Sequence, residues 1–80
     1  MTNQVEIIEW IVSCSTDAWE PVGSPKKPAM CRTVGFVVHE DEESLSLASS
    51  VAYHEGQDPD CCMTMTVPKI AIRKRSVLMT

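Results

Sequence analysis

The sequence predicts an all-β domain, and three observations carry that prediction. β-Branched residues, which favour strands, dominate the stretch 5–13. Apolar and polar residues then alternate over 31–39, 44–53 and 61–67, which is the period of a strand with one buried face. Pro68 removes a backbone hydrogen-bond donor directly after the last of these stretches, so the strand must end there. A strand, a tight turn at proline and a short closing strand indicate a small five-stranded barrel.

The chain has 80 residues, which is the size of a single domain, residues 1–80. No apolar run approaches the ~20 residues that a membrane-spanning helix needs. The first residues lack the basic and apolar regions of a secretory signal. We therefore expect a cytoplasmic protein that makes no contact with a membrane.

Charge is distributed unevenly along the chain, which has a net charge of −4. Acidic residues fill the middle, and a basic cluster lies near the C-terminal end: Lys69, Arg73, Lys74 and Arg75. Overall acidity argues against binding to the phosphate backbone of nucleic acid. We therefore do not expect nucleic acid as a main partner, because the basic cluster allows only a local patch.

The four cysteines are poorly spaced for a zinc site. Cys14, Cys31 and the adjacent pair Cys61 and Cys62 contain no Cys-x2-Cys knuckle. Adjacent residues of a strand also point to opposite faces, so they rarely bind one metal together. We expect free thiols, no metal and no cofactor.

The first strand is expected over Val5–Ser13, with Ile8, Trp10 and Val12 facing the core. Large apolar residues also occupy the odd positions, so this strand is expected to be covered on both sides. A helix of about two turns is the alternative, although the density of β-branched residues counts against it.

Residues 15–28 are expected to form a long irregular loop, because they include three prolines and one glycine. Loops of this length in small domains are usually functional or mobile. Trp19 lies in this loop and has two interpretations. It is either a lid over one end of the barrel or an exposed aromatic anchor for a partner.

The second strand is expected over Cys31–His39. Gly35 in its middle indicates a bulge, a bend or the close approach of a neighbouring side chain such as a tryptophan. The acidic run Glu40–Glu43 is expected to be a solvated hairpin tip, because it lacks the spaced ligands and the glycine of a calcium loop.

The third strand is expected over 44–53, with a short helical turn as the alternative, and the fourth over 61–67. Alternate positions of these strands are expected to face inward: Leu45, Leu47, Ser49, Val51, Met63, Met65 and Val67. Apolar residues after Pro68 are expected to close the end of the barrel: Ile70, Ile72, and Val77 or Leu78.

The segment Val67-Pro68-Lys69-Ile70-Ala71-Ile72 resembles the part of SH3-like barrels in which one 3-10 turn joins the fourth and fifth strands. The loop 15–28 would correspond to the long first loop of that fold. The resemblance implies a small five-stranded SH3-like barrel with a 3-10 turn before the last strand. The aromatic residues of SH3 domains that bind proline-rich peptides are missing, so polyproline recognition is not implied.

Nearly the whole chain also resembles a family of small uncharacterised proteins of tailed bacteriophages. The shared features are the strand with Trp10, the loop with Trp19, residues 31–38, the acidic turn, and Val67-Pro68-Lys69 with Ile72 and Leu78. The chain departs from the family where an aspartate usually follows the tryptophan, since Val12 and Ser13 stand there. The resemblance implies a phage-encoded accessory factor in the host cytoplasm and supplies no activity.

No catalytic motif is visible, whether a glycine-flanked serine, a phosphate-binding loop or a histidine pair at helical spacing. We therefore expect no catalytic residues and a non-enzymatic binding module that docks on a host or phage macromolecule, with a protein as the partner. The candidate binding residues are Trp19, Arg32, Arg73 and Arg75. The alternative is an oligomer that sequesters a small molecule, such as a nucleotide signal, at subunit interfaces. A homo-oligomer is compatible with both functions.

Overall fold

A computed structural model describes residues 3–13, 19, 21–23 and 27–79, so most of the loop 15–28 lies outside the described residues. The elements are β1 (Val5–Val12), β2 (Ala29–Glu40), β3 (Ser44–Ala52), β4 (Asp60–Pro68), the 3-10 turn η1 (Lys69–Ala71) and β5 (Ile72–Met79). The predicted all-β fold, its five strands and the 3-10 turn before the last strand are confirmed. Within this part of the chain, no helix is long and apolar enough to cross a membrane.

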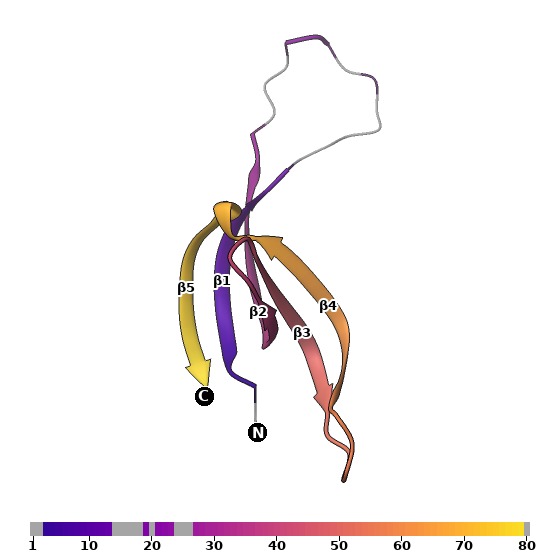
Figure 1. Ribbon diagram of the computed structural model, residues 1–80. Coiled ribbons are helices and arrows are strands. Elements are labelled where there is room, and N and C mark those ends of the chain that lie inside the picture. Colours follow the sequence, from indigo (N-terminus) through magenta and orange to yellow (C-terminus); the bar gives the residue numbers. More distant parts are fainter. Residues whose placement is uncertain (1–2, 14–18, 20, 24–26, 80) are drawn as a thin grey trace.

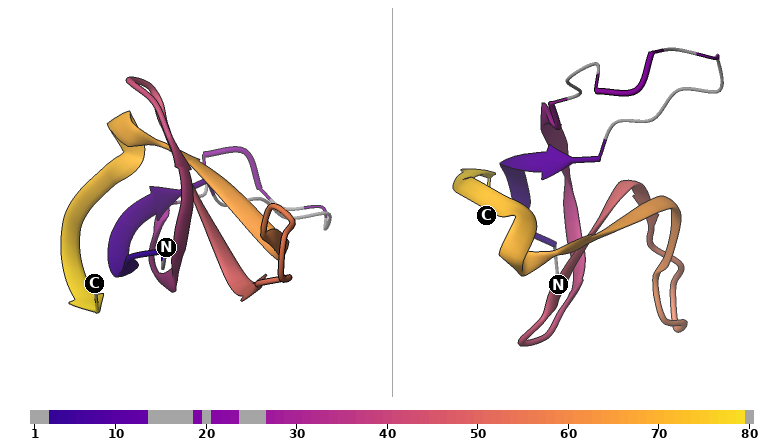
Figure 2. Two further views of the ribbon diagram at one scale, coloured as in Figure 1. Left: turned by 60° about the horizontal axis from the view of Figure 1, so that its bottom comes forward. Right: turned by 90° about the horizontal axis from the view of Figure 1, so that it is seen from above.

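The five strands form one antiparallel sheet in the order β4-β3-β2-β1-β5 (Figure 1). β1 pairs with β2, β2 with β3 and β3 with β4, and β5 pairs with the other side of β1. The edge strands β4 and β5 are joined by η1 and diverge from it (Figure 2). The sheet therefore curls but keeps two open edges, and the described strands do not close into the expected barrel.

The sheet curls because β2 changes its partner along its length. Residues 29–36 pair with β1, and residues 36–40 pair with β3. Gly35 lies at this change. A Cβ atom on residue 35 would lie 2.9 Å from the carbonyl oxygen of Ala48 and 3.0 Å from the Cβ of Leu47. The sequence predicts a bend or a close approach at Gly35, and the approaching group is the backbone of β3 rather than a tryptophan.

The core lies on the face of the curled sheet that we call the inner face. Its most deeply buried large side chains are Ile8 from β1, Leu45 and Leu47 from β3, and Val67 from β4. Three partly buried side chains pack against them: Trp10, Val37 and Ile72. The inward direction predicted for Ile8 and Trp10 in β1 and for the first half of β3 is thus confirmed. Val12 is partly buried and does not belong to this cluster.

The edge strands differ from the prediction. The sequence predicts Met63 and Met65 on the buried face, but Met63 is 81% exposed and Met65 is exposed as well. Ile70, which is 88% exposed, does not close the end of the core, and neither do the exposed residues Val77 and Leu78. Alternation shows which face of a strand is apolar, but burial also needs a neighbouring element over that face. The open edges provide no such element along most of β4 and β5.

The first half of β3 is buried on both faces, contrary to the alternation in its sequence. Ser46 and Ala48 are buried, and the hydroxyl oxygens of Ser46 and Thr66 are hydrogen-bonded at 2.8 Å. Beyond Ala48, β3 pairs with β4 alone, so Ser49 is exposed and Val51 is only partly buried. Figure 1 shows this end of the β3–β4 hairpin projecting from the rest of the sheet.

Two isoleucines near η1 provide a direct test of this packing. We expect Ile72→Ala to lower the free energy of unfolding by about 1–3 kcal/mol, because Ile72 packs against the core but is not fully buried. The same substitution at the exposed Ile70 is expected to cost less than about 0.5 kcal/mol. Chemical denaturation of both variants measures the difference. Equal losses would contradict the placement of Ile72.

Candidate functional site

A cluster of four charged side chains lies at the end of the inner face. The guanidinium of Arg75 in β5 donates two hydrogen bonds to the carboxylate of Glu6 in β1, at 2.8 and 2.9 Å. It also donates to Glu40 at the end of β2, at 2.9 and 3.2 Å. Lys69 in η1 contacts Glu40 at 2.7 Å. The cluster therefore ties η1 and β5 to the first two strands.

The charges in this cluster hold each other ionised. Glu6 is only 2% exposed, and a carboxylate buried so deeply needs a partner that satisfies both of its oxygens. The hydrogen bonds from Arg75 lower the pKa of Glu6, although burial opposes this shift. Arg75 and then Lys69 lower the pKa of Glu40 from 4.5 to about 2, and both carboxylates raise the pKa of Arg75. Carboxyl groups with lowered pKa values stay charged, which does not suit a general acid.

A hollow of about 590 Å³ lies beside this cluster. Its lining includes Asn3, Val37 and Pro59 as well as Glu6, Glu40 and Arg75. The Tyr53 hydroxyl at its rim donates a hydrogen bond to the side-chain oxygen of Asn3 at 3.1 Å, and the side-chain nitrogen of Asn3 donates to the Val37 carbonyl at 2.7 Å. The side chains of Asn3, Tyr53, Glu6, Glu40 and Arg75 already bind one another or the backbone, so they stabilise the fold rather than present unused donors.

The opposite side of the sheet, which we call the outer face, is unusually apolar. The strand register places seven apolar side chains there: Val5, Ile7 and Ile11 from β1, Met30, Val34 and Phe36 from β2, and Met79 from β5. A polar row crosses them, in which Arg32 donates to Glu9 at 2.8 Å and Lys74 lies beside Glu9 in the register. No described element packs over this face, and Val34 at its centre is 53% exposed.

The sequence predicts that β1 is covered on both sides, and the structure does not confirm this. Val5 and Ile7 are only partly buried, because their cover consists of neighbouring side chains of the same sheet. Contiguous apolar surfaces of this kind commonly mark sites where another protein docks.

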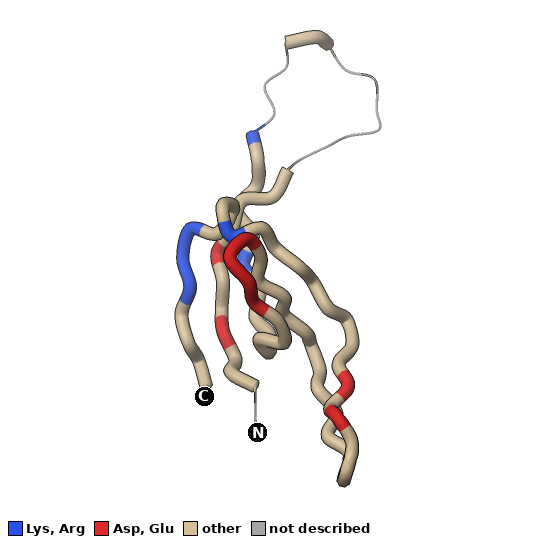
Figure 3. Tube along the Cα trace, viewed as in Figure 1, with Lys and Arg blue, Asp and Glu red and all other residues tan. Residues whose placement is uncertain are grey.

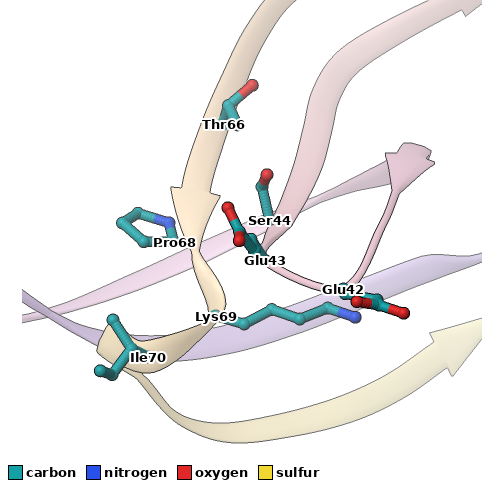
Figure 4. Close-up of a pocket in the computed structure, with 7 residues that line it drawn as sticks. All are labelled: Glu42, Glu43, Ser44, Thr66, Pro68, Lys69 and Ile70. Carbon is teal, nitrogen blue, oxygen red and sulfur yellow. The ribbon is translucent and has the colours of Figure 1, made fainter.

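The acidic turn between β2 and β3 is a hairpin tip, as predicted. Asp41 accepts hydrogen bonds from the backbone N–H groups of Glu43 and Ser44, at 2.9 and 2.8 Å. These bonds lower the pKa of Asp41 from 3.8 to about 2 and fix the turn. A second hollow, of about 650 Å³, lies between this turn and the end of β4, and Figure 4 shows Glu42 and Glu43 beside Lys69 there.

The four predicted binding residues are not brought together. Trp19 is fully exposed, so its interpretation as a lid is wrong, and its role as an anchor stays a prediction. Arg32 lies on the outer face and is paired with Glu9. Arg73 donates to the carbonyl of Ile70 at 2.8 Å, and Arg75 belongs to the inner cluster. Two of the four C-terminal basic residues, Lys69 and Arg75, thus form ion pairs within the inner cluster.

The described cysteines lie on two different strands. Cys31 in β2 is partly buried, and Cys61 and Cys62 in β4 are exposed. All three are free thiols, and Cys14 lies outside the described residues. Among residues 3–13, 19, 21–23 and 27–79, no group of three or more cysteine, histidine or acidic side chains is placed to hold a metal.

Comparisons with known proteins do not assign the chain to a family. No family model matches it, and no curated protein or solved structure matches it significantly. The expected relation to bacteriophage proteins therefore stays a prediction. We therefore infer the function from the surfaces of the molecule.

The sequence analysis did not predict the buried carboxylate of Glu6 or its pairing with Arg75. Glu6 occupies an even position of β1, the set that points inward, so an inward carboxylate could have been anticipated from the alternation alone. Its partner Arg75 lies 69 positions along the chain, and only the pairing of β5 with β1 brings the two together.

The ion-pair cluster predicts how stability depends on pH. The pKa of Glu40 is lower in the folded chain than its ordinary value of 4.5. Ionised Glu40 therefore adds to the free energy of unfolding above its ordinary pKa, and this contribution is lost as the pH falls toward the lowered pKa. We expect the free energy of unfolding to fall between about pH 5 and pH 2. Glu40→Gln is expected to reduce this slope, and Glu6 and Asp41, whose pKa values are also lowered, are expected to maintain the remainder.

Denaturation at a series of pH values measures this slope. Glu55→Gln, at an exposed position between β3 and β4, is the control and is expected to leave the slope close to that of the wild type. A slope that stays unchanged in Glu40→Gln would contradict the assigned ion pairs.

Proposed function

We propose that the chain is a non-enzymatic binding module and that the outer face is the surface that docks on a protein partner. The observation that carries this proposal is the seven-residue apolar set on β1, β2 and β5, which no described element covers. Removing such a surface from water stabilises a complex by roughly 25 cal/mol per Å² of apolar area before the costs of association.

The composition of the outer face supports a protein as the partner. Apolar residues surround the pair formed by Arg32 and Glu9, and arginine beside apolar side chains is typical of the centre of protein interfaces. Glu9 lies beside both Arg32 and Lys74 in the register and lowers the positive potential that a nucleic acid would need. That nucleic acid is not the main partner stays a prediction, which these charges support.

The inner cluster supports a non-enzymatic role. Glu6, Glu40 and Arg75 are saturated by one another. Hydrogen bonds from Arg75 lower the pKa values of Glu6 and Glu40, and backbone hydrogen bonds lower the pKa of Asp41 in the turn. Each of these shifts keeps a structural charge in place.

A photo-reactive amino acid at Val34 tests this proposal, with the same residue at Ile70 as the control. Both positions are exposed, but Ile70 lies in η1 and not on the outer face. We expect one protein to be cross-linked from Val34 and not from Ile70. The identified protein is then purified, and its affinity for Val34→Glu is expected to be at least about tenfold weaker than for the wild type.

Ile70→Glu is expected to bind this partner as the wild type does. Equal binding of Val34→Glu and the wild type would contradict the proposal. A small molecule retained in the native mass of the purified protein would instead favour the alternative function, sequestration of a small molecule.

A further inference from the structure

The two open edges of the sheet carry an inference that is independent of the outer face. Along each edge, the backbone N–H and C=O groups that point away from the sheet have no partner among the described strands. Native sheets usually protect such edges with charged residues, proline or very short strands. The stretch from Cys61 to Val67 in β4 has no charged residue, and the end of β5 exposes Val77, Leu78 and Met79.

Met63 gives a second indication at the β4 edge. Its backbone has φ of 55°, in the left-handed region, which is unfavourable for a residue with a side chain. Such conformations persist where the surroundings impose them. Met63 is largely exposed, however, and the described residues do not enclose it. A chain that lies along β4 would supply the missing surroundings.

We infer that the β4 edge of one copy pairs antiparallel with the β5 edge of a second copy. A register that sets Met63 opposite Val77 of the second copy also sets Thr66 opposite Lys74. Thr66 and Lys74 both point to the outer face, because their neighbours Val67 and Arg75 point to the inner face. The faces of the two sheets are then continuous across the junction.

This direction matches the chemistry of both strands. It brings the exposed apolar end of β5, Val77 to Met79, to the exposed start of β4, Cys61 to Met63. A parallel arrangement would instead set Met63 opposite the basic residues of β5. The antiparallel direction also agrees with the other four pairings of the sheet.

Charge complementarity supports the same arrangement. The start of β5 carries Arg73 and Lys74, and the acidic turn lies beside the end of β4 (Figure 3). Among the described residues, Glu42, Glu43 and Lys74 form no ion pair within one copy. The proposed register directs Lys74 of the second copy toward the hollow that Glu42, Glu43, Ser44 and Thr66 line (Figure 4).

The pairing is head-to-tail, so it leaves one β4 edge and one β5 edge free at the ends of every open assembly. Copies therefore add until a ring closes or a filament grows. β4 and β5 of one copy diverge from η1 (Figure 2) and do not pair with each other.

Sedimentation velocity and native mass spectrometry over ~1 to ~100 μM protein test the inference. We expect assemblies larger than a dimer, with masses that are multiples of 8.9 kDa. Val34→Glu on the outer face is expected to leave the assembly unchanged. A monomer at all concentrations would overturn the inference. A dimer that Lys74→Glu leaves intact would also overturn it, since two copies paired through identical edges or outer faces have no β4–β5 junction.

Two charge-reversal variants identify the contact itself. Lys74→Glu and Glu43→Lys each place like charges at every junction, and each is expected to weaken assembly roughly tenfold or more. Mixing the two variant proteins restores opposite charges at every mixed junction, so we expect assembly to recover. Recovery also shows that both variants are folded. Variants that assemble like the wild type, or a mixture that stays as weak as its components, would overturn the proposed register.

Discussion

The close approach of Gly35 to the backbone of β3 is the contact on which the rest of the structure depends. Without a Cβ atom at this position, the Ala48 carbonyl and the Leu47 side chain can lie directly against β2. β2 can then pair with β1 along its first part and with β3 along its second. This change of partner folds β3 and β4 over Ile8 and creates the inner face.

The same bend determines which surfaces stay open. The five strands cover the centre of the inner face, and the chain provides no described element for the outer face or for the edges at β4 and β5. Completely buried apolar side chains are few, which fits the limited burial that a chain of this size achieves. The buried Glu6 and the half-buried Arg75 extend the inner face with an ion pair. The surfaces proposed for docking and for self-assembly are thus the parts that a single small sheet cannot cover itself.

The local sequence predicted the strands well, because apolar and polar residues alternate along a strand that has one buried face. The ends of β1, β3 and β4 lie within one residue of the expected positions, whereas β2 begins two residues earlier than expected. Pro68 directly precedes η1, as expected. Burial was predicted only where a neighbour covers the strand: Val67 is buried, whereas Met63 and Met65 are exposed. The Glu6–Arg75–Glu40 cluster and the outer face depend on which strands become neighbours. That information lies in contacts between distant residues and not in any one stretch.

The stability of Gly35→Ala tests the central claim most directly. Adding one methyl group at this contact forces the backbone of β3 to move, and we expect the free energy of unfolding to fall by about 1–3 kcal/mol. Val34→Ala, next to it on the outer face, is the control and is expected to cost less, because Val34 is half exposed. A Gly35→Ala protein as stable as the wild type would contradict the account.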